Sequence, residues 1–599
     1  MFGYEATLTL PPNDDTRKSM KYSDQIGEWL RDLGYTHYFY VGGGNIMHLT
    51  ESLSRYLIGV PVVHEVAAGI GAEYFNEIAK PGQRARALVT TGPGLTNIVT
   101  AVSGAWLESR ELLVIGGQVK VSDLASDGLR GRGIQEINGV ELLRSTTKGA
   151  VQLREPIDAQ AFKAIVAQSW LPRKGPVFLE MPLNVQAATV EPQIIGAADT
   201  PELAAVYEVD LASIVARYNS AKKPIVLIGG GVSYEVAHAM QGRLSETRVP
   251  VMTTYNGADR VDGYSDSYLG RPNTWGQRSS NILIQQSDFI IAVGTRLGMQ
   301  QTGFNWQEFG REAYIVQVEI DPAELRKGHP RIDQGLCADA DNFLQRFLSS
   351  SLNQHDGWLD YARKVRAAVP RVEPVNQTGQ NYLSPYDFIV TLESLTKSDD
   401  LVIPCSSGSA FTLSMQLYKQ RFGQRMLTNK SLAAMGYGLS GAVGASIAAN
   451  YTRRTILIEG DGGFAQNMQE VGTAEINSLN LKIFIFHDQG HASIRMTQVS
   501  YFKGKYLGCD RKSGLGLPNW DKLFPAWNVP VVHVNRDFEK DPVFLKHFDQ
   551  PGLCAFIVQI DPEQTYFPKI SSRITANGSM ESNPIDKMTP EIDYLRDLS

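Results

Sequence analysis

The sequence has few of the features that mark secreted, membrane-spanning or nucleic-acid-binding proteins. Its four cysteines are widely spaced among 599 residues and form no CxxC pair, so they indicate neither a disulfide framework nor a zinc site. No stretch reaches about 18 uninterrupted apolar residues, and the N-terminus lacks the apolar run of a signal peptide. Lys and Arg number 57 against 63 Asp and Glu, which leaves a net charge of −6 and no basic excess to attract a polyanion. We therefore expect a cytoplasmic protein that binds neither membrane nor nucleic acid.

One local pattern, in contrast, occurs three times: an apolar run, a glycine turn, and a segment with helical spacing. It occupies residues 86–102, 223–240 and 455–471. Apolar runs that alternate with amphipathic segments are typical of βαβ units and parallel sheets. The repetition predicts an α/β protein of three consecutive doubly wound domains with mainly parallel sheets.

Polar and proline-bearing stretches separate the three patterns. They lie at 189–203 and 368–387 and have the composition of linkers. The resulting division is a first domain at 20–188, a central domain at 200–350, a third domain at 380–565 and a C-terminal tail at 566–599. The tail is polar and weakly periodic, so we expect it to drape over a surface rather than form a core.

The third pattern, "TILIEGDGGFAQNMQE", places a carboxylate inside a glycine turn. Backbone N–H groups of such a strand-to-helix turn can hold an anion, while Asp461 can hold a divalent cation that the anion shares. Mg²⁺ takes oxygen ligands, and Asp488, which ends the next apolar run, and the carbonyl of Gly490 could supply the others. An ordinary βα turn with no ligand is the alternative interpretation.

Several motifs then occur in a characteristic order. They are "HEVAAGIGAEYF", "TTGPGLTN" at 90–97, "GGQV" at 116–119, "IQE" at 134–136, "MGYGLSGAVGA" at 435–445 and the GDG turn. Together they resemble the acetolactate synthase group of thiamine diphosphate enzymes over nearly the whole chain. One departure is that the Asn-Asn pair usual in that group reads His487-Asp488 here. Aspartate is also an oxygen ligand, whereas His487 has no assigned role beyond ending a strand.

The resemblance implies thiamine diphosphate and Mg²⁺ as cofactors and assigns residues to them. Glu65 would hydrogen-bond the pyrimidine ring of the cofactor, and Met435 would support its bent shape; without the resemblance, Met435 would be read as core filling. The implied diphosphate and metal set is Gly408, Ser409, Gly460, Asp461, Gly462, Gly463, Asp488 and Gly490, with Asp461, Asp488 and the Gly490 carbonyl as metal ligands. Gln118 and Gln135 are candidate catalytic hydrogen-bonding residues, with ordinary surface glutamines as the alternative.

The same resemblance implies FAD in the central domain. The residues that match are Gly229, Gly230, Gly231, Gly294, Arg296, Glu319 and Asp339. The group's Arg-Phe-Asp-Asp-Arg run reads "RLGMQ" at 296–300, which loses both aspartates and the second arginine. A flavin-free central domain is therefore the alternative.

The expected reaction decarboxylates a small 2-keto acid such as pyruvate and joins its two-carbon unit to an acceptor ketone. Gly43 and Gly44 would form the wall of the donor pocket, with Gln118 beside it. Thr497 stands where the group has a tryptophan, so the mouth of the site should be wider, and we expect a nucleotide-linked keto-sugar as acceptor. The alternatives are acetolactate synthase itself, a 2-keto acid decarboxylase, and a non-catalytic nucleotide-binding scaffold. Because the first and third domains supply different parts of the site, a homodimer or homotetramer is expected.

Overall fold

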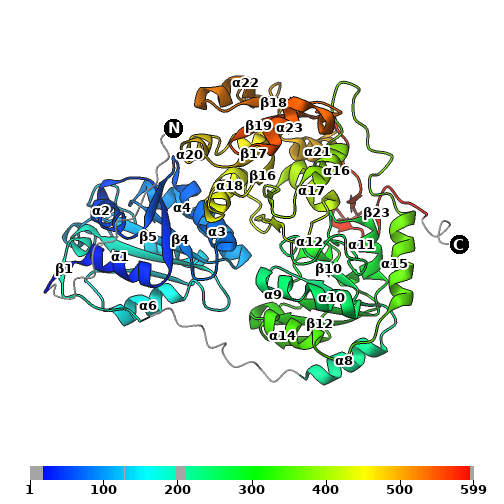
Figure 1. Cartoon of the computed structure of the whole chain (residues 1–599), viewed down its shortest axis with the longest axis horizontal. Coiled ribbons are helices and arrows are strands. Elements are labelled where there is room, and N and C mark those ends of the chain that lie inside the picture. Colours follow the sequence, from blue (N-terminus) through cyan, green and yellow to red (C-terminus); the bar gives the residue numbers. More distant parts are fainter. Residues whose placement is uncertain (1–17, 127, 197–209, 594–599) are drawn as a thin grey trace.

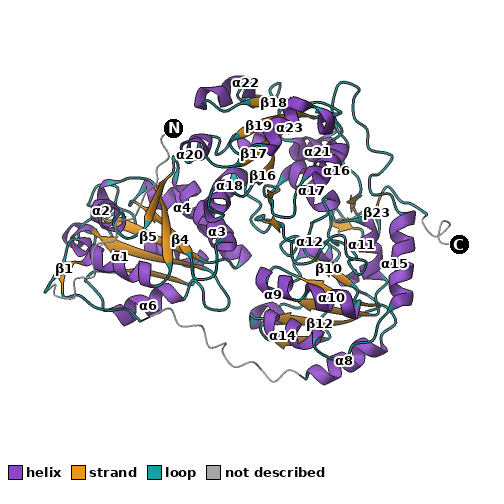
Figure 2. Cartoon of the chain, viewed as in Figure 1, coloured by secondary structure: helices purple, strands orange, loops and turns teal. Residues whose placement is uncertain are grey.

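Three parallel sheets covered by helices follow one another along the chain, which confirms the predicted fold class (Figures 1 and 2). The computed structural model describes residues 18–126, 128–196 and 210–593. Part of the predicted linker at 189–203, and the predicted start of the central domain at residue 200, lie outside these residues.

The first domain is built on a six-stranded sheet. Its strands, in spatial order, are β3 (Ile58–Pro61), β2 (Tyr35–Tyr40), β4 (Arg84–Val89), β5 (Leu112–Gln118), β7 (Pro176–Pro182) and β6 (Gly149–Gln152), all parallel. Its helices are α1 (Tyr22–Asp32), α2 (Met47–Leu53), α3 (Glu65–Ile78), α4 (Pro93–Glu108), α5 (Gly139–Leu143), α6 (Ala159–Ala167) and α7 (Leu183–Gln186). A two-stranded antiparallel pair, β1 (Met20–Lys21) and β8 (Thr189–Val190), joins the ends of the domain.

The central domain has five parallel strands. They run in the order β10 (Val251–Thr253), β9 (Pro224–Ile228), β11 (Phe289–Val293), β12 (Tyr314–Glu319) and β13 (Gln334–Cys337). The helices of this region are α8 (Leu211–Ser220), α9 (Tyr234–Ala239), α10 (Gln241–Thr247), α11 (Arg278–Gln285), α12 (Met299–Thr302), α13 (Pro322–Arg326), α14 (Ala340–Leu348) and α15 (Asp356–Ala368).

The third domain repeats the strand order of the first. Its strands are β15 (Arg425–Met426), β14 (Leu401–Ile403), β16 (Thr455–Gly460), β17 (Leu481–His487), β19 (Cys554–Gln559) and β18 (Val531–Val534), all parallel. Its helices are α16 (Pro385–Leu395), α17 (Gly408–Leu417), α18 (Tyr437–Ala448), α19 (Asp461–Phe464), α20 (Glu470–Ile476), α21 (Ala492–Phe502), α22 (Trp520–Leu523) and α23 (Pro542–Asp549). In both sheets the second strand along the chain lies at one edge and the fifth at the other.

The central strands are apolar along their whole length because helices cover both faces. In β17 every residue before His487 is buried, including Lys482, whose ammonium group donates to backbone carbonyls of Gln550 and Gly552. Such continuous burial is typical of parallel sheets. The polar residues therefore gather where the strands end.

Helices α3 and α18 join the first and third domains, and they lie side by side in Figure 1. A Cβ added at Gly444 would meet the Gly71 carbonyl oxygen at 2.1 Å, and one added at Gly441 would meet the Tyr74 ring at 2.7 Å. Residue numbers fall along one helix as they rise along the other, so the two helices are antiparallel. One hydrophobic core cluster accordingly contains residues of both domains.

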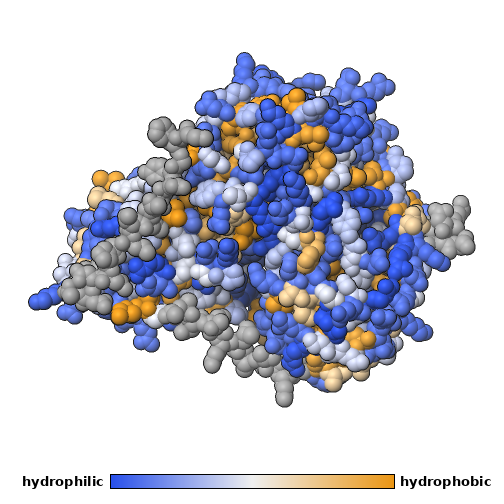
Figure 3. Space-filling model, viewed as in Figure 1, coloured by the Kyte–Doolittle hydropathy of each residue, from blue (hydrophilic) through white to orange (hydrophobic). Residues whose placement is uncertain are grey.

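The tail forms two short strand pairs, β20 (Lys569–Ile570) with β23 (Met588–Thr589) and β21 (Ser572–Ile574) with β22 (Met580–Ser582). It does more than drape over a surface, because Ile585 is 1 % exposed and belongs to a core cluster of the central domain. No helix among the described residues has the length and apolarity needed to cross a bilayer. The face drawn in Figure 3 is largely hydrophilic and is hollowed between the first and central domains.

Candidate active site

The GDG turn lies at the carboxyl end of β16, in the middle of the third sheet. Asp461 begins α19 and is fully buried. Its Oδ2 accepts a hydrogen bond from the Gln489 amide at 2.9 Å, and its Oδ1 accepts one from the Gly490 amide at 3.3 Å. The predicted metal ligands on β16 and after β17 are therefore adjacent, as expected for neighbouring parallel strands.

His487, which had no assigned role, contacts the same carboxylate. Its Nδ1 lies 2.9 Å from Asp461 Oδ2. This contact fixes the plane of the Asp461 carboxylate together with the two backbone amides. His487 therefore belongs to the supports of the predicted metal site.

Asp488 is also buried, and its partner is Arg495 of α21. Arg495 Nη2 donates to Asp488 Oδ1 at 2.8 Å. Burial, followed by the neighbouring Asp461, raises the pKa of Asp488 in the absence of a cation. A divalent cation bound beside these two buried carboxylates would offset the cost of burying them in their charged form. The described residues contain no group of three or more His, Cys, Asp and Glu side chains fit for a metal; the predicted set consists of two carboxylates and a carbonyl.

The amino end of α17 offers the matching anion site. Ser407 precedes this ten-residue helix and makes no side-chain cap. Gly408 has a φ of +82°, and a Cβ there or at Gly460 would meet nothing within 4 Å. Ser409, the next predicted contact, is 7 % exposed. These open backbone positions fit a diphosphate beside a cation.

Glu65 is the first residue of α3, after the short loop that follows β3. It is 8 % exposed, and Asn97 Nδ2 donates to its Oε2 at 2.9 Å. The loop before it is fixed by Glu470 of the third domain, which accepts hydrogen bonds from the amides of Val63 and His64.

Gln118 and Gln135 both contact the Thr91 hydroxyl at the carboxyl edge of the first sheet, but they differ in exposure. Gln118 is 1 % exposed, and its amide group is bonded to Thr91, to the Ile137 carbonyl and to Glu180. Gln135 has an exposed side chain and a φ of +61°. Gln118 thus holds the segment that carries Gln135, and Gln135 is the one that faces outward.

The other predicted substrate contacts lie at the same two sheet edges. Gly43 follows β2 and packs so closely on Thr90 that a Cβ would come within 2.5 Å, whereas the space beside Gly44 is open. Thr497 is exposed on α21, where its hydroxyl donates to the Ser493 carbonyl at 3.0 Å.

The predicted flavin residues follow strands of the central sheet, except Glu319, which is the last residue of β12. Gly231 donates from its amide to the Gly294 carbonyl at 2.9 Å, so the two glycine turns touch. Arg296 Nη2 donates to Ser431 Oγ at 2.9 Å. Glu319 is 9 % exposed and burial raises its pKa, while Asp339 caps α14 through the Asn342 amide. These residues line one edge, which is where open α/β sheets bind ligands.

Met435, just before α18, is 40 % exposed and contacts Gln466. Because α3 and α18 are antiparallel, Glu65 at the start of α3 and Met435 lie at opposite ends of the pair. Contacts of helix α4 also indicate that Glu65 and Met435 are far apart. Asn97 donates to Glu65, whereas Glu108, eleven residues later on the same helix, accepts from the amide of Ser431, which shortly precedes Met435. That separation is about 16 Å along a helix. Within one chain, Glu65 and Met435 are therefore far apart.

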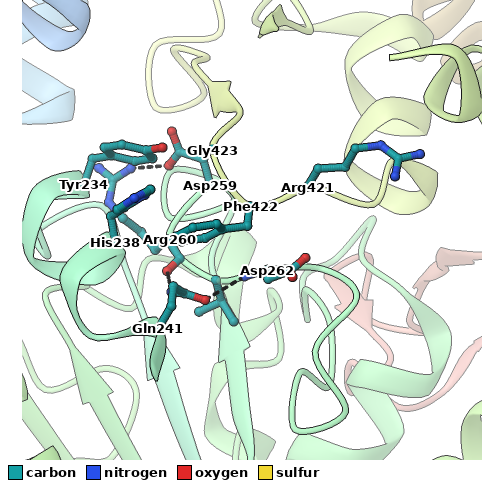
Figure 4. A pocket seen from close by; sticks show the side chains of 10 residues that line it. Tyr234, His238, Gln241, Asp259, Arg260, Asp262, Arg421, Phe422 and Gly423 are labelled. Atoms are coloured by element: carbon teal, nitrogen blue, oxygen red, sulfur yellow. Dashed lines mark hydrogen bonds and ion pairs between the residues drawn. The ribbon is translucent and has the colours of Figure 1, made fainter. Parts of the chain in front are cut away.

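A separate small pocket lies between the central and third domains (Figure 4). The rings of His238 and Phe422 stack at 4.1 Å on its wall. Its lining residues are not among those predicted for the active site.

Comparison with known proteins assigns a family to each of the three domains. Residues 20–142 match the model for "Thiamine pyrophosphate enzyme, N-terminal TPP binding domain", 211–347 that for the central domain, and 406–558 that for the "C-terminal TPP binding domain". The chain belongs to the thiamine pyrophosphate enzymes. It is thus a thiamine diphosphate-dependent enzyme that forms carbon–carbon bonds.

Acetolactate synthases are among the relatives of this thiamine pyrophosphate enzyme. The chain is 28 % identical to acetolactate synthase 2, chloroplastic, of Nicotiana tabacum, over 93 % of this chain and 84 % of the relative. It is 26 % identical to the isozyme 1 large subunit of Escherichia coli, over 93 % and 96 %, and 28 % identical to the isozyme 2 large subunit, over 94 % and 98 %.

Several residues of the site were not predicted from the sequence. Asn97, Glu470 and Arg495 all hold predicted residues in place. Glu459, directly before the GDG turn, is buried against the start of α18, and burial raises its pKa to about 8. Asn97 ends the motif at 90–97 and could have been found from that motif. The others are polar residues in apolar or helical surroundings and carry no local signal.

Proposed function

We propose that the chain decarboxylates pyruvate and joins the resulting two-carbon unit to a second carbonyl compound, at a site that two copies of the chain form together. The observation that carries this proposal is the separation of Glu65 and Met435 at opposite ends of the α3–α18 pair. A carboxylate for the pyrimidine and a support for the bent cofactor must act on one molecule. A second copy related by two-fold symmetry would bring them together and create two equal sites.

Exposed apolar side chains at both half-sites support this assembly. In the third domain they are Met435, Ile494, Val499, Tyr501, Phe502 and Leu507, and in the first domain Met47, Val63 and Ile134, the last 84 % exposed. Helix α21 buries Arg495 and Gln498, whereas its Ile494, Val499, Tyr501 and Phe502 are exposed. Apolar groups that remain in water on one copy would be covered by another.

Different residues of the chain would have different roles in this reaction. Bound thiamine diphosphate supplies a nucleophilic carbon and an electron sink for loss of CO₂ from a 2-keto acid. Asp461, Asp488 and the Gly490 carbonyl would hold Mg²⁺, and the open amino end of α17 would bind the diphosphate. Glu65 would hold a proton at a ring nitrogen of the pyrimidine. Gln135 and Gly44 would border the space for the 2-keto acid.

Two acceptors are in question. The acetolactate synthases among the relatives favour a second 2-keto acid, which would make the product an acetohydroxy acid. One feature favours a larger ketone such as a nucleotide-linked keto-sugar: Thr497 and Gln300 are both exposed, where the acetolactate synthase group has a tryptophan and an arginine. A wide mouth without that cation would accept bulk and would bind a small carboxylate less well.

The product formed from pyruvate decides between them. Purified protein with thiamine diphosphate and Mg²⁺ is given pyruvate alone, or pyruvate with either 2-ketobutyrate or a nucleotide keto-sugar, and products are identified by mass. Fast acetohydroxy acid formation supports the first acceptor. A two-carbon adduct of the keto-sugar supports the second, and CO₂ release with neither adduct would contradict carboligation.

The Thr497→Trp variant sharpens this test. If the wide mouth admits a large ketone, the indole should lower kcat/KM for that ketone by about tenfold and leave a small 2-keto acid little affected. The control is Thr497→Val, which preserves the space. An equal loss for both acceptors would argue against a role of Thr497 in acceptor choice.

We further propose that the central domain binds FAD, along the edge that carries Gly229–Gly231, Gly294 and Arg296. Arg296 points across the domain boundary to Ser431, so a bound flavin would also contact the third domain. The test is the absorption spectrum of the purified protein. A band near 450 nm that is released on denaturation is expected, and its absence after reconstitution with FAD would refute flavin binding.

A further inference from the structure

The metal site contains one more negative charge than the group it resembles. Asp488 stands where the acetolactate synthase group has a neutral asparagine, and it is buried with Asp461 beside it. Two buried carboxylates repel each other. A site that must also accept a diphosphate therefore needs a compensating positive charge in addition to the metal ion.

Arg495 supplies a positive charge at this place. It is the fourth residue of α21, and its side chain is 4 % exposed beside the 3 % exposed Asp488 side chain. Its Nη2 lies 2.8 Å from both the Oδ1 and the main-chain oxygen of Asp488. Such a charge-assisted hydrogen bond in a buried setting is strong and directional.

Two further carbonyl groups fix the guanidinium. Nη1 donates to the Cys509 carbonyl at 3.4 Å and Nε to the Pro562 carbonyl at 3.3 Å. The arginine is thus held by three separate segments and can hold Asp488 in one orientation. Among the hydrogen bonds of the described residues, none engages Asp488 Oδ2, so one carboxylate oxygen stays available for a cation.

We propose that Arg495 is a positioning residue that cancels the extra charge of Asp488 and turns it into a one-oxygen ligand for Mg²⁺. The Asp488–Arg495 pair then carries the same net charge as the neutral asparagine of the acetolactate synthase group. The inference rests on the proposed cofactor binding and is independent of the acceptor.

The test compares three variants by calorimetric titration of dialysed apoprotein with thiamine diphosphate at saturating MgCl₂. Arg495→Met leaves a buried carboxylate uncompensated beside the diphosphate and should weaken binding by at least about tenfold. The double variant Asp488→Asn/Arg495→Met restores the net charge with a neutral ligand. It should bind within about threefold of the wild type, whereas Arg495→Lys, which keeps the charge and loses the fork, should lie between the two.

A purely structural role of Arg495 gives a different result. If the arginine only ties Cys509 and Pro562 to the ligand loop, removing the Asp488 charge cannot rescue its loss. A double variant that binds as weakly as Arg495→Met, or an Arg495→Met variant that binds like the wild type, would overturn the proposal. Should Arg495→Met fail to fold, a soluble double variant that binds the cofactor supports it and an insoluble one overturns it.

A second buried ion pair of the same domain is the matched control. Arg454 bonds Asp400 at 2.9 and 2.7 Å, before strands β16 and β14 and hence at the opposite edge of the sheet. Arg454→Met should lower thermal stability without changing cofactor affinity more than about threefold. A wild-type protein that binds no thiamine diphosphate would contradict the proposed function itself, a result distinct from wild-type binding with an unrescued double variant.

Discussion

At the scale of single residues, we expect replacement of Glu65 to cause the largest loss of activity. Glu65→Gln keeps the size and the Asn97 hydrogen bond but removes the carboxylate. We expect carboligation to fall by at least about 100-fold, the usual contribution of a proton-transferring group, with cofactor affinity little changed. Steady-state product formation and calorimetry measure the two effects. Glu51→Gln, on the exposed face of α2, is the control, and near wild-type turnover by Glu65→Gln would refute the assignment.

Because of the buried Glu180, we expect the free energy of unfolding to depend on pH. Glu180 is fully buried between Gln118 and Gln152, and burial raises its pKa from 4.5 to about 7. Folding therefore favours the protonated form: this stabilisation is complete below about pH 4.5 and is lost as the pH rises through 7. The wild type should lose about 1–3 kcal/mol between pH 5 and pH 8 relative to Glu180→Gln. Equal changes in unfolding midpoint for both proteins between these pH values would contradict the shifted pKa.

At the scale of elements, the contact of α3 with α18 depends on glycine. Gly444→Ala would place a methyl group about 2 Å from the Gly71 carbonyl oxygen, so the helices must separate, at a cost of about 1–3 kcal/mol. Gly357→Ala, in α15, meets nothing within 4 Å and should stabilise slightly. Thermal unfolding of the two variants should change in opposite directions. A neutral Gly444→Ala would show that the helices do not approach this closely.

The elements also show how far the sequence alone can lead. The strands β16 and β17 were predictable because both faces are buried and most of their residues are apolar. The position of Asp461 beside Asp488 followed, since the carboxyl ends of parallel strands share an edge. The insertion of Ile585 into the central domain was not predictable, because single apolar residues in a polar tail give no periodicity. Glu470, more than 400 residues from His64, likewise has no local pattern that reveals its partner.

At the scale of the whole molecule, the proposed active site depends on how the three domains of one copy are placed relative to those of another. The first and third sheets have the same strand order and are packed through α3 and α18, yet this packing keeps Glu65 away from Met435. A site inside one chain would need these domains to repack. A site between two chains needs only an interface that covers the exposed apolar residues of α21 and of the first domain.

Complementation between two inactive variants tests whether two chains share each site. Glu65→Gln and Asp461→Asn, each inactive alone, are co-expressed and purified as a mixture. If each site takes Glu65 from one chain and Asp461 from the other, a mixed dimer contains one intact site, and random pairing restores about a quarter of wild-type activity. Activity no greater than that of the separate variants, in a preparation shown by mass spectrometry to contain mixed dimers, would contradict the shared site.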